Sequence, residues 1–483
     1  MWPDASARQE FQPAPVIFCA LSISATYYFT LNPRLFPLRL WLLPVTFASI
    51  WHLCTKFYYS DPWLNAFNFV NCVTGVAFTM KLIDIATMTE PPRYDGKSAC
   101  TRSSIFCGTC YLNNISYSLD MRCLHWHSES PCHRPRDPRP DDTHSRFYRS
   151  TLFLCLKHLF YFDTAQALIA NMGTHGIPQG DTIFRNTFAL TRNHTIHLPH
   201  PMFIALPLAL FGGLSVMNIL AAGHYFVTLL AAPFHWLPPS ISPYSLPASA
   251  LKKEWPPIFD GPLDAISVRD FWSHRWHALF RRSFLTAGGK PGAAAGGYLG
   301  GLVDYVVAPK GNSGSRKANI SARKLGMRIG GVMGVFLASG VMHDWGAWGT
   351  GQGTEFWSIA GYFLLQGVVV IVEEALGLTG TKEPTVKNTQ NSANGAAANG
   401  VTMNGTAANE SSVITHEKEE YEQQSGANHY FMKVWTFVWV VVPATLMIDA
   451  WVRRGVTCVV IVPHSLSPAR VLIRFWNDFA FGD

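Results

Sequence analysis

Charge is scarce in this sequence of 483 residues. Lys, Arg, Asp and Glu together make up 14% of it, whereas about a quarter is usual for a soluble globular protein. Hydrophobic residues make up 48% and aromatic residues 13%. The composition excludes an ordinary soluble enzyme and indicates an all-α, polytopic integral membrane protein.

Other absences narrow the class further. The first ten residues, MWPDASARQE, lack the basic stretch of a cleaved signal peptide, so we expect the first apolar segment to be retained. The net charge of +7 is not gathered into a basic run with interleaved aromatics, which argues against a nucleic acid partner. Ten cysteines in so long a chain do not define a disulfide framework. No internal repeat is evident, which disfavours a transporter built from duplicated halves.

Apolar stretches close to the roughly 20 residues that cross a bilayer recur along the chain. We predict eight to nine transmembrane helices, the count depending on whether residues 201–236 cross once or begin a second crossing. The eight predicted spans are residues 14–31, 36–54, 63–83, 150–172, 201–236, 325–348, 356–378 and 431–451.

Shifts in composition divide the chain into seven regions. The many Lys and Arg residues between 238 and 324 place that region in the cytosol by the positive-inside rule, and its one apolar piece, 298–308, is too short to cross. We expect that piece to lie in the interface or to re-enter. The regions are N-terminal transmembrane helices (1–90), a polar Cys- and His-rich loop (91–149), transmembrane helices (150–237), the basic cytosolic region (238–324), core helices (325–378), a disordered insertion rich in Asn, Ala, Gly and Thr (379–428), and a C-terminal transmembrane helix with its tail (429–483).

The Cys- and His-rich loop contains residue types that bind zinc. Cys107 and Cys110 are followed by Cys123, Cys132 and several histidines, but their spacing fits no standard zinc finger or ribbon. We therefore predict no metal site.

Residues 325–348, LGMRIGGVMGVFLASGVMHDWGAW, form an apolar run that ends in a His-Asp pair. On a helix, Gly326, Gly330, Gly334 and Ala338 would lie on one stripe, a pattern that lets two membrane helices approach closely. A neighbouring stripe places His343 one turn after Ser339. A polar side chain at that depth is costly unless it is partnered or lines a wet cavity, so His343 is either a functional residue or a hydrogen-bonded structural histidine.

A second constellation, Arg269 to His277, reads R-D-F-W-S-H-R-W-H. Its arginines suit a phosphorylated ligand and its tryptophans suit an acyl or adenine slot. An amphipathic interfacial helix, anchored by the same residues, is the structural alternative.

Together the two stretches resemble the wax-synthase-like branch of the membrane-bound O-acyltransferase (MBOAT) superfamily. That family carries an aromatic-rich F-W-x-x-R-W-[NH] motif followed by a histidine in an apolar helix. The resemblance is specific between about residues 251 and 348. Histidine at the end of the first motif, as at His277, is most similar to fungal members that acetylate terpenoid or meroterpenoid hydroxyls.

The resemblance implies an MBOAT-like helical core and transfer of an acyl group, acetyl in the first instance, from acyl-CoA to an alcohol. An imidazole has an unperturbed pKa near 6.5, so His343 can accept the alcohol proton as general base. His277 would orient the substrate or donate to the thioester oxygen. Acyl-CoA is a co-substrate, and no bound cofactor or metal is expected. The residues predicted to bind substrate are Trp272, Arg275, Trp276, Arg281, Arg282, Ser339 and Asp344, the arginines as partners for CoA phosphates.

Asp344 is the weaker candidate, because on a helix it lies about 100° away from His343. At 1.5 Å per residue, His343 would lie roughly 27 Å beyond Leu325. Either the helix begins in the cytosol, or the long arm of CoA reaches down a tunnel.

Two alternatives stay open at the level of sequence. A long-chain wax ester synthase would differ only in the volume of its acyl tunnel. A proton-coupled transporter would use His343, Glu373 and Glu374, but it leaves the Arg269–His277 motif unexplained. The expected partners are acyl-CoA, a hydrophobic alcohol and the lipid bilayer, and the expected location is the endoplasmic reticulum membrane.

Overall fold

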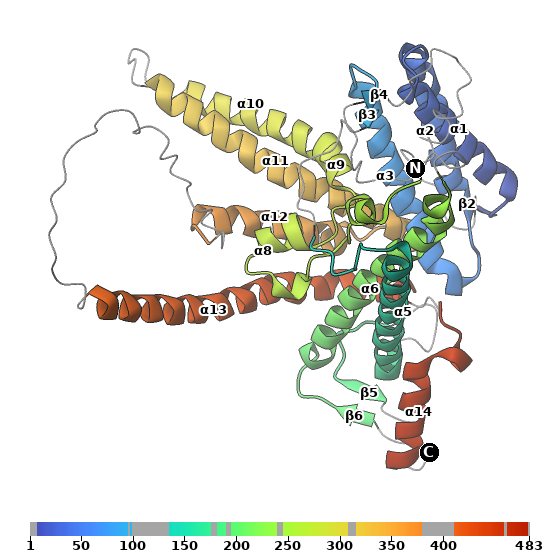
Figure 1. The fold of residues 1–483 in the computed structure, drawn as a ribbon, viewed down its shortest axis with the longest axis vertical. Coiled ribbons are helices and arrows are strands. Elements are labelled where there is room, and N and C mark those ends of the chain that lie inside the picture. The colour runs from blue at the N-terminus through green and yellow to red at the C-terminus, as the bar shows by residue number, and fades with distance from the viewer. Residues whose placement is uncertain are drawn as a thin grey trace.

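The computed structural model describes residues 7–94, 97–98, 135–174, 181–189, 195–238, 245–307, 315–378, 410–457 and 461–481. Long helices dominate these ranges (Figure 1). The longer helices are α1 (Pro13–Leu31), α2 (Arg39–Lys56), α3 (Asn65–Thr87), α5 (His144–Ile169), α6 (Met202–Trp236), α10 (Lys290–Val307), α11 (Ser315–Ala347), α12 (Phe356–Ala375), α13 (Glu410–Arg453) and α14 (Pro468–Phe481).

Short elements connect the long helices. The two-stranded pairs are β1 (Gln9–Glu10) with β2 (Phe57–Tyr58), β3 (Arg93–Tyr94) with β4 (Lys97–Ser98), and β5 (Thr187–Ala189) with β6 (Thr195–His197); the first is parallel and the others antiparallel. The short helices between α6 and α10 are α7 (Leu251–Glu254), α8 (Val268–Asp270) and α9 (Arg281–Phe284), and π-helical turns follow α8, α9 and α11. The described chain is therefore an all-helical scaffold with marginal strands, as predicted.

Seven helices in the described ranges are long and apolar enough to cross a membrane. They coincide with seven of the eight predicted spans. The eighth, residues 36–54, forms helix α2, which contains Pro44 and is less apolar than the others. Residues 202–236 form one continuous helix without a charged side chain, so no second crossing begins there. The seven spans are Pro13–Leu31, Pro62–Thr87, His144–Met172, Met202–Trp236, Ala322–Gln352, Phe356–Ala375 and His429–Arg453.

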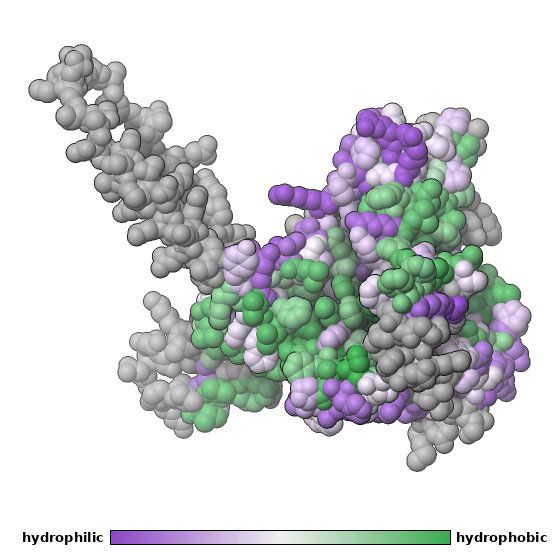
Figure 2. Space-filling model, turned by 90° about the horizontal axis from the view of Figure 1, so that it is seen from below, coloured by the Kyte–Doolittle hydropathy of each residue, from purple (hydrophilic) through white to green (hydrophobic). Residues whose placement is uncertain are grey.

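The surface of these spans is apolar. Large hydrophobic side chains such as Phe153, Phe234 and Trp357 are more than 50% exposed. Figure 2 shows broad hydrophobic areas on one face, bordered by hydrophilic residues. Such a surface is what lipid tails contact in an integral membrane protein.

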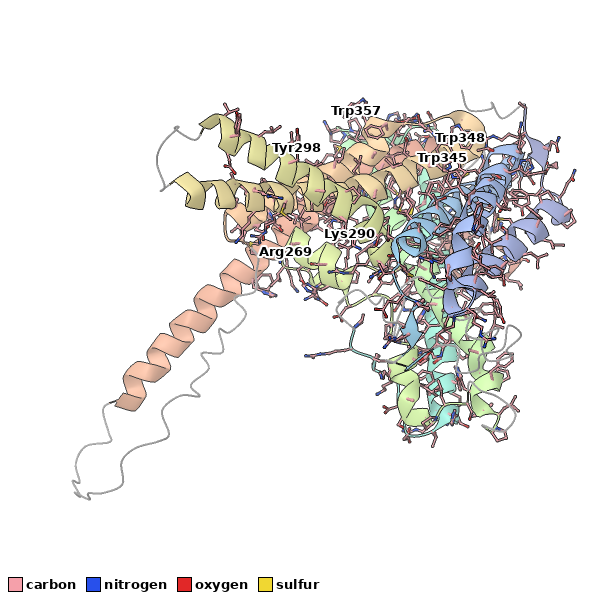
Figure 3. All side chains as sticks on the ribbon, turned by 90° about the horizontal axis from the view of Figure 1, so that it is seen from above. Arg269, Lys290, Tyr298, Trp345, Trp348 and Trp357 are labelled. Atoms are coloured by element: carbon pink, nitrogen blue, oxygen red, sulfur yellow. The ribbon has the colours of Figure 1, made fainter. Side chains whose placement is uncertain are left out.

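Helices α10 and α11 form an antiparallel hairpin that projects from the rest of the protein (Figures 1 and 3). A Cβ added at Gly330 would lie 3.0 Å from the carbonyl carbon of Gly292, and Gly334 faces Gly288 in the same way. The small-residue stripe predicted on 325–348 is thus the contact surface of the hairpin. Its partner helix begins at Lys290, eight residues before the apolar piece 298–308. That piece is not a separate interfacial segment, because Gly and Ala residues continue the helix toward its N-terminus.

This contact makes a testable prediction. We expect Gly330→Leu to separate α10 from α11 and to destabilise the protein by at least about 1–3 kcal/mol, because the added side chain overlaps backbone. The measurement is the melting temperature of detergent-purified protein. Gly301→Leu is the matched control, since a Cβ at Gly301 meets no atom within 4 Å. Equal melting temperatures for the two variants would contradict the close packing.

Two sequence predictions fall largely outside the described residues. All five cysteines of the Cys- and His-rich loop, from Cys100 to Cys132, lie there, so the prediction of no zinc site stays a prediction. Residues 379–409 of the predicted insertion lie there too. Helix α13 begins at Glu410, so residues 410–428 of the predicted insertion are helical.

Candidate active site

One cavity of about 280 Å³ lies where α6, α11, α12, α13 and residues 262–285 meet. His277 and His343, the two predicted catalytic residues, both line it. Its other walls are almost entirely hydrophobic and aromatic, contributed mainly by α6 and α13. Such a cavity with a few convergent polar groups is the usual form of a small-molecule site. The predicted substrate-binding residues that line it are Trp272, Trp276, Arg281 and Ser339, and those that do not are Arg275, Arg282 and Asp344.

His343 is held in one orientation near the end of α11. Its Nδ1 lies 2.7 Å from the carbonyl oxygen of Ser339, one turn earlier. Because a carbonyl only accepts, Nδ1 carries the proton, and in the neutral ring Nε2 keeps the lone pair of a base. The imidazole stacks on Phe363 at 4.5 Å between ring centroids and on Trp451 at 6.1 Å. The stacked rings fix the plane in which that lone pair points.

His277 belongs to the segment between α6 and α10, outside the candidate spans. Burial, with a smaller contribution from the nearby His343, lowers the pKa of His277 to about 3, so its ring is neutral at physiological pH. Within the described part of the chain, its Nδ1 is buried without a hydrogen-bond partner. Buried polar atoms normally have one, so this nitrogen is available to a substrate atom.

Trp272 and Trp276 position this segment against the cavity. The indole Nε1 of Trp272 donates to Oε1 of the fully buried Gln366 at 3.1 Å, and the Trp272 ring packs against Phe363. Trp276 stacks on Phe271 at 5.3 Å between ring centroids. Trp272 therefore ties the motif to α12, the helix that also carries the ring stacked on His343.

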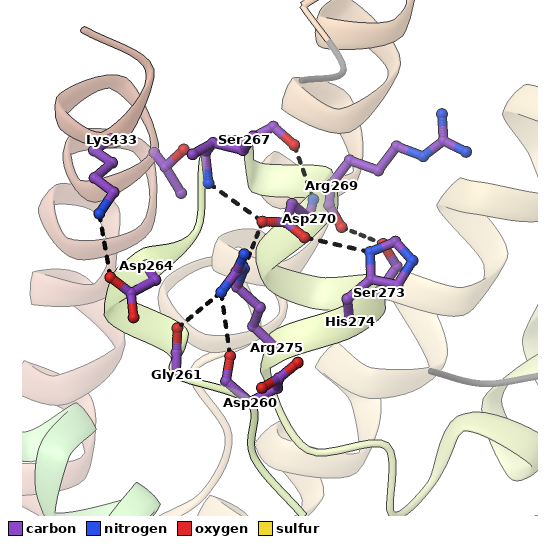
Figure 4. Close-up of polar contacts among 12 residues, drawn as sticks. Asp260, Gly261, Asp264, Ser267, Arg269, Asp270, Ser273, His274, Arg275 and Lys433 are labelled. Atoms are coloured by element: carbon purple, nitrogen blue, oxygen red, sulfur yellow. Dashed lines mark hydrogen bonds and ion pairs between the residues drawn. The ribbon is translucent and has the colours of Figure 1, made fainter. Parts of the chain in front are cut away.

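The polar residues of the motif brace its own backbone (Figure 4). Asp270 accepts a 2.6 Å bond from Nε of Arg275 and lies 3.4 Å from His274. Arg275 also donates to the carbonyl oxygen of Asp260 at 3.3 Å. Ser267 caps the motif, accepting from the backbone N–H of Asp270 at 2.9 Å. The motif is not an interfacial amphipathic helix but a packed segment that delivers His277 to the cavity.

Glu373 of α12 holds the start of the motif. Its carboxylate accepts from the backbone N–H groups of Val268 and Arg269 at 2.8 and 2.9 Å, and from Trp435 at 3.0 Å. Glu374 pairs with Arg269 and with Arg328. These contacts give both acids structural roles, and neither of them lines the cavity that contains the two histidines.

Three predicted substrate-binding residues have other partners. Arg282 makes a two-pronged contact with the buried Asp84 of α3, at 3.0 and 2.8 Å. Asp344 accepts from the backbone N–H of Glu355 at 2.8 Å, at the start of α12, and so does not orient His343. Arg275 is held as described above. Their assignment to substrate binding stays a prediction, and the structure gives each of them a competing structural role.

The aromatic wall that α12 and α13 contribute to the cavity could not be found from sequence. Phe363, Trp451 and Tyr362 lie within apolar spans that contain many similar residues, and nothing in the local pattern singles them out. Helix α11 itself begins at Ser315, ten residues before Leu325, and the motif folds alongside it. The depth predicted for His343 is therefore no obstacle, because residues 262–285 reach the same cavity.

Comparison with known proteins agrees with this geometry. The Membrane bound O-acyl transferase family matches residues 255–365, which include the motif, His277 and His343. The O-mevalon transferase macI of Penicillium terrestre is 25% identical over 336 residues, which cover 62% of this chain and 71% of that protein. No solved structure matches the chain significantly. With its apolar spans and a matched region that carries both cavity histidines, the chain is an integral membrane enzyme whose residues 255–365 are similar to the membrane bound O-acyl transferase family.

Proposed function

We propose that this protein transfers an acetyl group from acetyl-CoA to a hydroxyl of a hydrophobic terpenoid or meroterpenoid, in the endoplasmic reticulum membrane. The observation that carries the proposal is that His277 and His343, brought from separate segments, line one apolar cavity. The fungal relative is an O-mevalon transferase, which supports transfer of a group to or from oxygen.

In the proposed reaction, the hydroxyl oxygen of the acceptor attacks the thioester carbon while Nε2 of His343 accepts the hydroxyl proton. The new C–O bond forms, and the carbonyl oxygen becomes an oxyanion. His277 carries its proton on Nδ1 or on Nε2, and in the former case it can donate to that oxygen. The C–S bond then breaks, and the imidazolium of His343 returns its proton to the sulfur of CoA. Protons balance without a metal or a redox group.

The size of the cavity supports a short acyl group. At about 280 Å³ it falls just below the roughly 300–1,000 Å³ of drug-sized ligand sites. A bulky acceptor and a long acyl chain would compete for this volume. An acetyl group would leave most of it to the acceptor, which favours an acetyltransferase over a long-chain wax ester synthase.

Labelled donors test the proposal directly. Microsomes that contain the protein would be given radiolabelled acetyl-CoA or palmitoyl-CoA, each with a terpenoid alcohol or a fatty alcohol. We expect labelled ester from acetyl-CoA and the terpenoid alcohol, at least about tenfold above microsomes without the protein. Preferential labelling from palmitoyl-CoA and the fatty alcohol would establish a wax ester synthase instead.

A further inference from the structure

Arg281 differs from the other arginines around the motif. Arg269, Arg275 and Arg282 each pair with a carboxylate, at 3.4, 2.6 and 2.8 Å respectively. Within the described residues Arg281 has no ion-pair partner; its Nη1 donates a long bond of 3.4 Å to the carbonyl oxygen of Ser273. Its Nε is buried without a hydrogen-bond partner in the same ranges.

Arg281 also lines the cavity that contains the two histidines. The lining includes no Asp or Glu, so Arg281 is its one charged side chain among the described residues. A guanidinium keeps its proton in proteins. A buried or half-buried charge is costly unless an opposite charge compensates it, and the described residues supply none on the cavity wall.

We propose that Arg281 binds a carboxylate carried by the substrate in the cavity, either on the acceptor or on the acyl group. This inference rests on the proposed function for the transfer of an acyl group to a hydroxyl; a carboxylate on the acyl group would mean that the group transferred is not acetyl. The planar guanidinium fork matches a carboxylate in a two-pronged geometry, and the unpartnered Nε is one of the donors that such a contact uses.

The phosphates of CoA are a poorer match to this position. In the proposed reaction the thioester lies beside the histidines, and the phosphates are at the other end of the pantetheine arm. A cavity of about 280 Å³ holds the reacting ends of two substrates but not the whole of CoA. An anion inside it therefore belongs to the acceptor or to the acyl group.

Two matched substrate pairs distinguish these sources. With acetyl-CoA as donor, a diterpenoid hydroxy acid is compared with its methyl ester as acceptor. With a neutral terpenoid alcohol as acceptor, succinyl-CoA is compared with butyryl-CoA, which is similar in length but uncharged at its end. We expect the parent to favour the carboxylate in one pair, by about 10- to 100-fold in kcat/KM, the value of a charged hydrogen bond.

Variants assign that preference to Arg281. We expect Arg281→Leu to abolish it, mainly by raising KM for the charged member, and Arg281→Lys to retain part of it. Arg146→Leu is the matched control, because Arg146 lies at the exposed start of α5 and pairs only with Asp142 among the described residues. A third comparison, of acetyl-CoA with acetylpantetheine, which lacks the phosphates of CoA, tests whether Arg281 binds those phosphates instead.

Three results would overturn the inference. One is a parent with no preference in either pair. Another is an Arg281→Leu variant that lowers kcat equally for all substrates, which would mean that the charge acts on the oxyanion. The third is a variant that loses only its preference for acetyl-CoA over acetylpantetheine.

The melting-temperature shift caused by the hydroxy acid and by its ester reports binding without turnover. If the parent protein is inactive but binds the hydroxy acid and not its methyl ester, the proposed function is wrong and the role of Arg281 in carboxylate binding still stands.

Discussion

Replacement of His343 by glutamine is expected to lower kcat by about 10²- to 10⁴-fold, while insertion and acyl-CoA binding are retained. Glutamine keeps much of the size of the ring and can still donate to the carbonyl oxygen of Ser339. It cannot accept the proton of an attacking hydroxyl at neutral pH. The lost interaction belongs to the transition state, so kcat should fall and KM for acyl-CoA should change little.

The alanine variant separates catalysis from structure. If His343 is the base, His343→Ala and His343→Gln should be equally inactive, and both should purify with a melting temperature near that of the parent. His277→Ala should cost less, since water can replace part of its orientation and donation. His52→Gln, at an exposed position of α2, is the control for the substitution itself.

A purely structural histidine gives a different pattern. Glutamine would then restore activity, and alanine would fail through low yield, because it leaves a gap between Phe363 and Trp451. Purified His343→Gln enzyme that turns over within about tenfold of the parent would end the assignment of a general base.

Much of the scaffold follows from the sequence because a bilayer restricts the choices. Spans must be helical, near 20 residues and apolar, and the runs around α1, α3 and α12 meet all three conditions. The glycine stripe of α11 also predicts its role, since glycine at every fourth position is typical of close packing between two membrane helices. The helix that packs against this stripe could not be predicted from the sequence. Helix α10 is too rich in Gly and Ala to stand out as a membrane segment.

Some residues of the cavity could likewise be predicted from the sequence, and others could not. His277, His343 and the two tryptophans could be predicted because polar or large aromatic residues are conspicuous at those places. The roles of the arginines could not, because a sequence shows charges but not their partners. Asp84 is nearly 200 residues before Arg282, and no local pattern connects them. Arg275, Arg281 and Arg282 look alike in the sequence. Only the fold shows that two are already paired and that one faces the cavity.

The pair of Arg282 and Asp84 gives the other large expected effect. Asp84 is 2% exposed, and its oxygens accept from Arg282 and, at 3.2 Å, from the hydroxyl of Thr286. Arg282→Leu would leave this carboxylate buried and largely uncompensated. Breaking one side of a buried ion pair costs about 3–5 kcal/mol, so we expect a much lower yield and melting temperature. The contact joins α3 to α9, the short helix that begins with Arg281, so activity should fall with stability.

A double-mutant cycle distinguishes this structural role from a contact with CoA. Replacing both residues with leucine removes the two charges together, which is often close to neutral for stability. We therefore expect Asp84→Leu/Arg282→Leu to recover most of the melting temperature lost in Arg282→Leu, with a coupling energy of at least about 2–3 kcal/mol. The recovered protein should have nearly the parental KM for acyl-CoA. If Arg282 instead binds the phosphates of CoA, stability would change little in the single variant. KM for acyl-CoA would then stay raised in both variants, since removal of Asp84 cannot replace the lost cation.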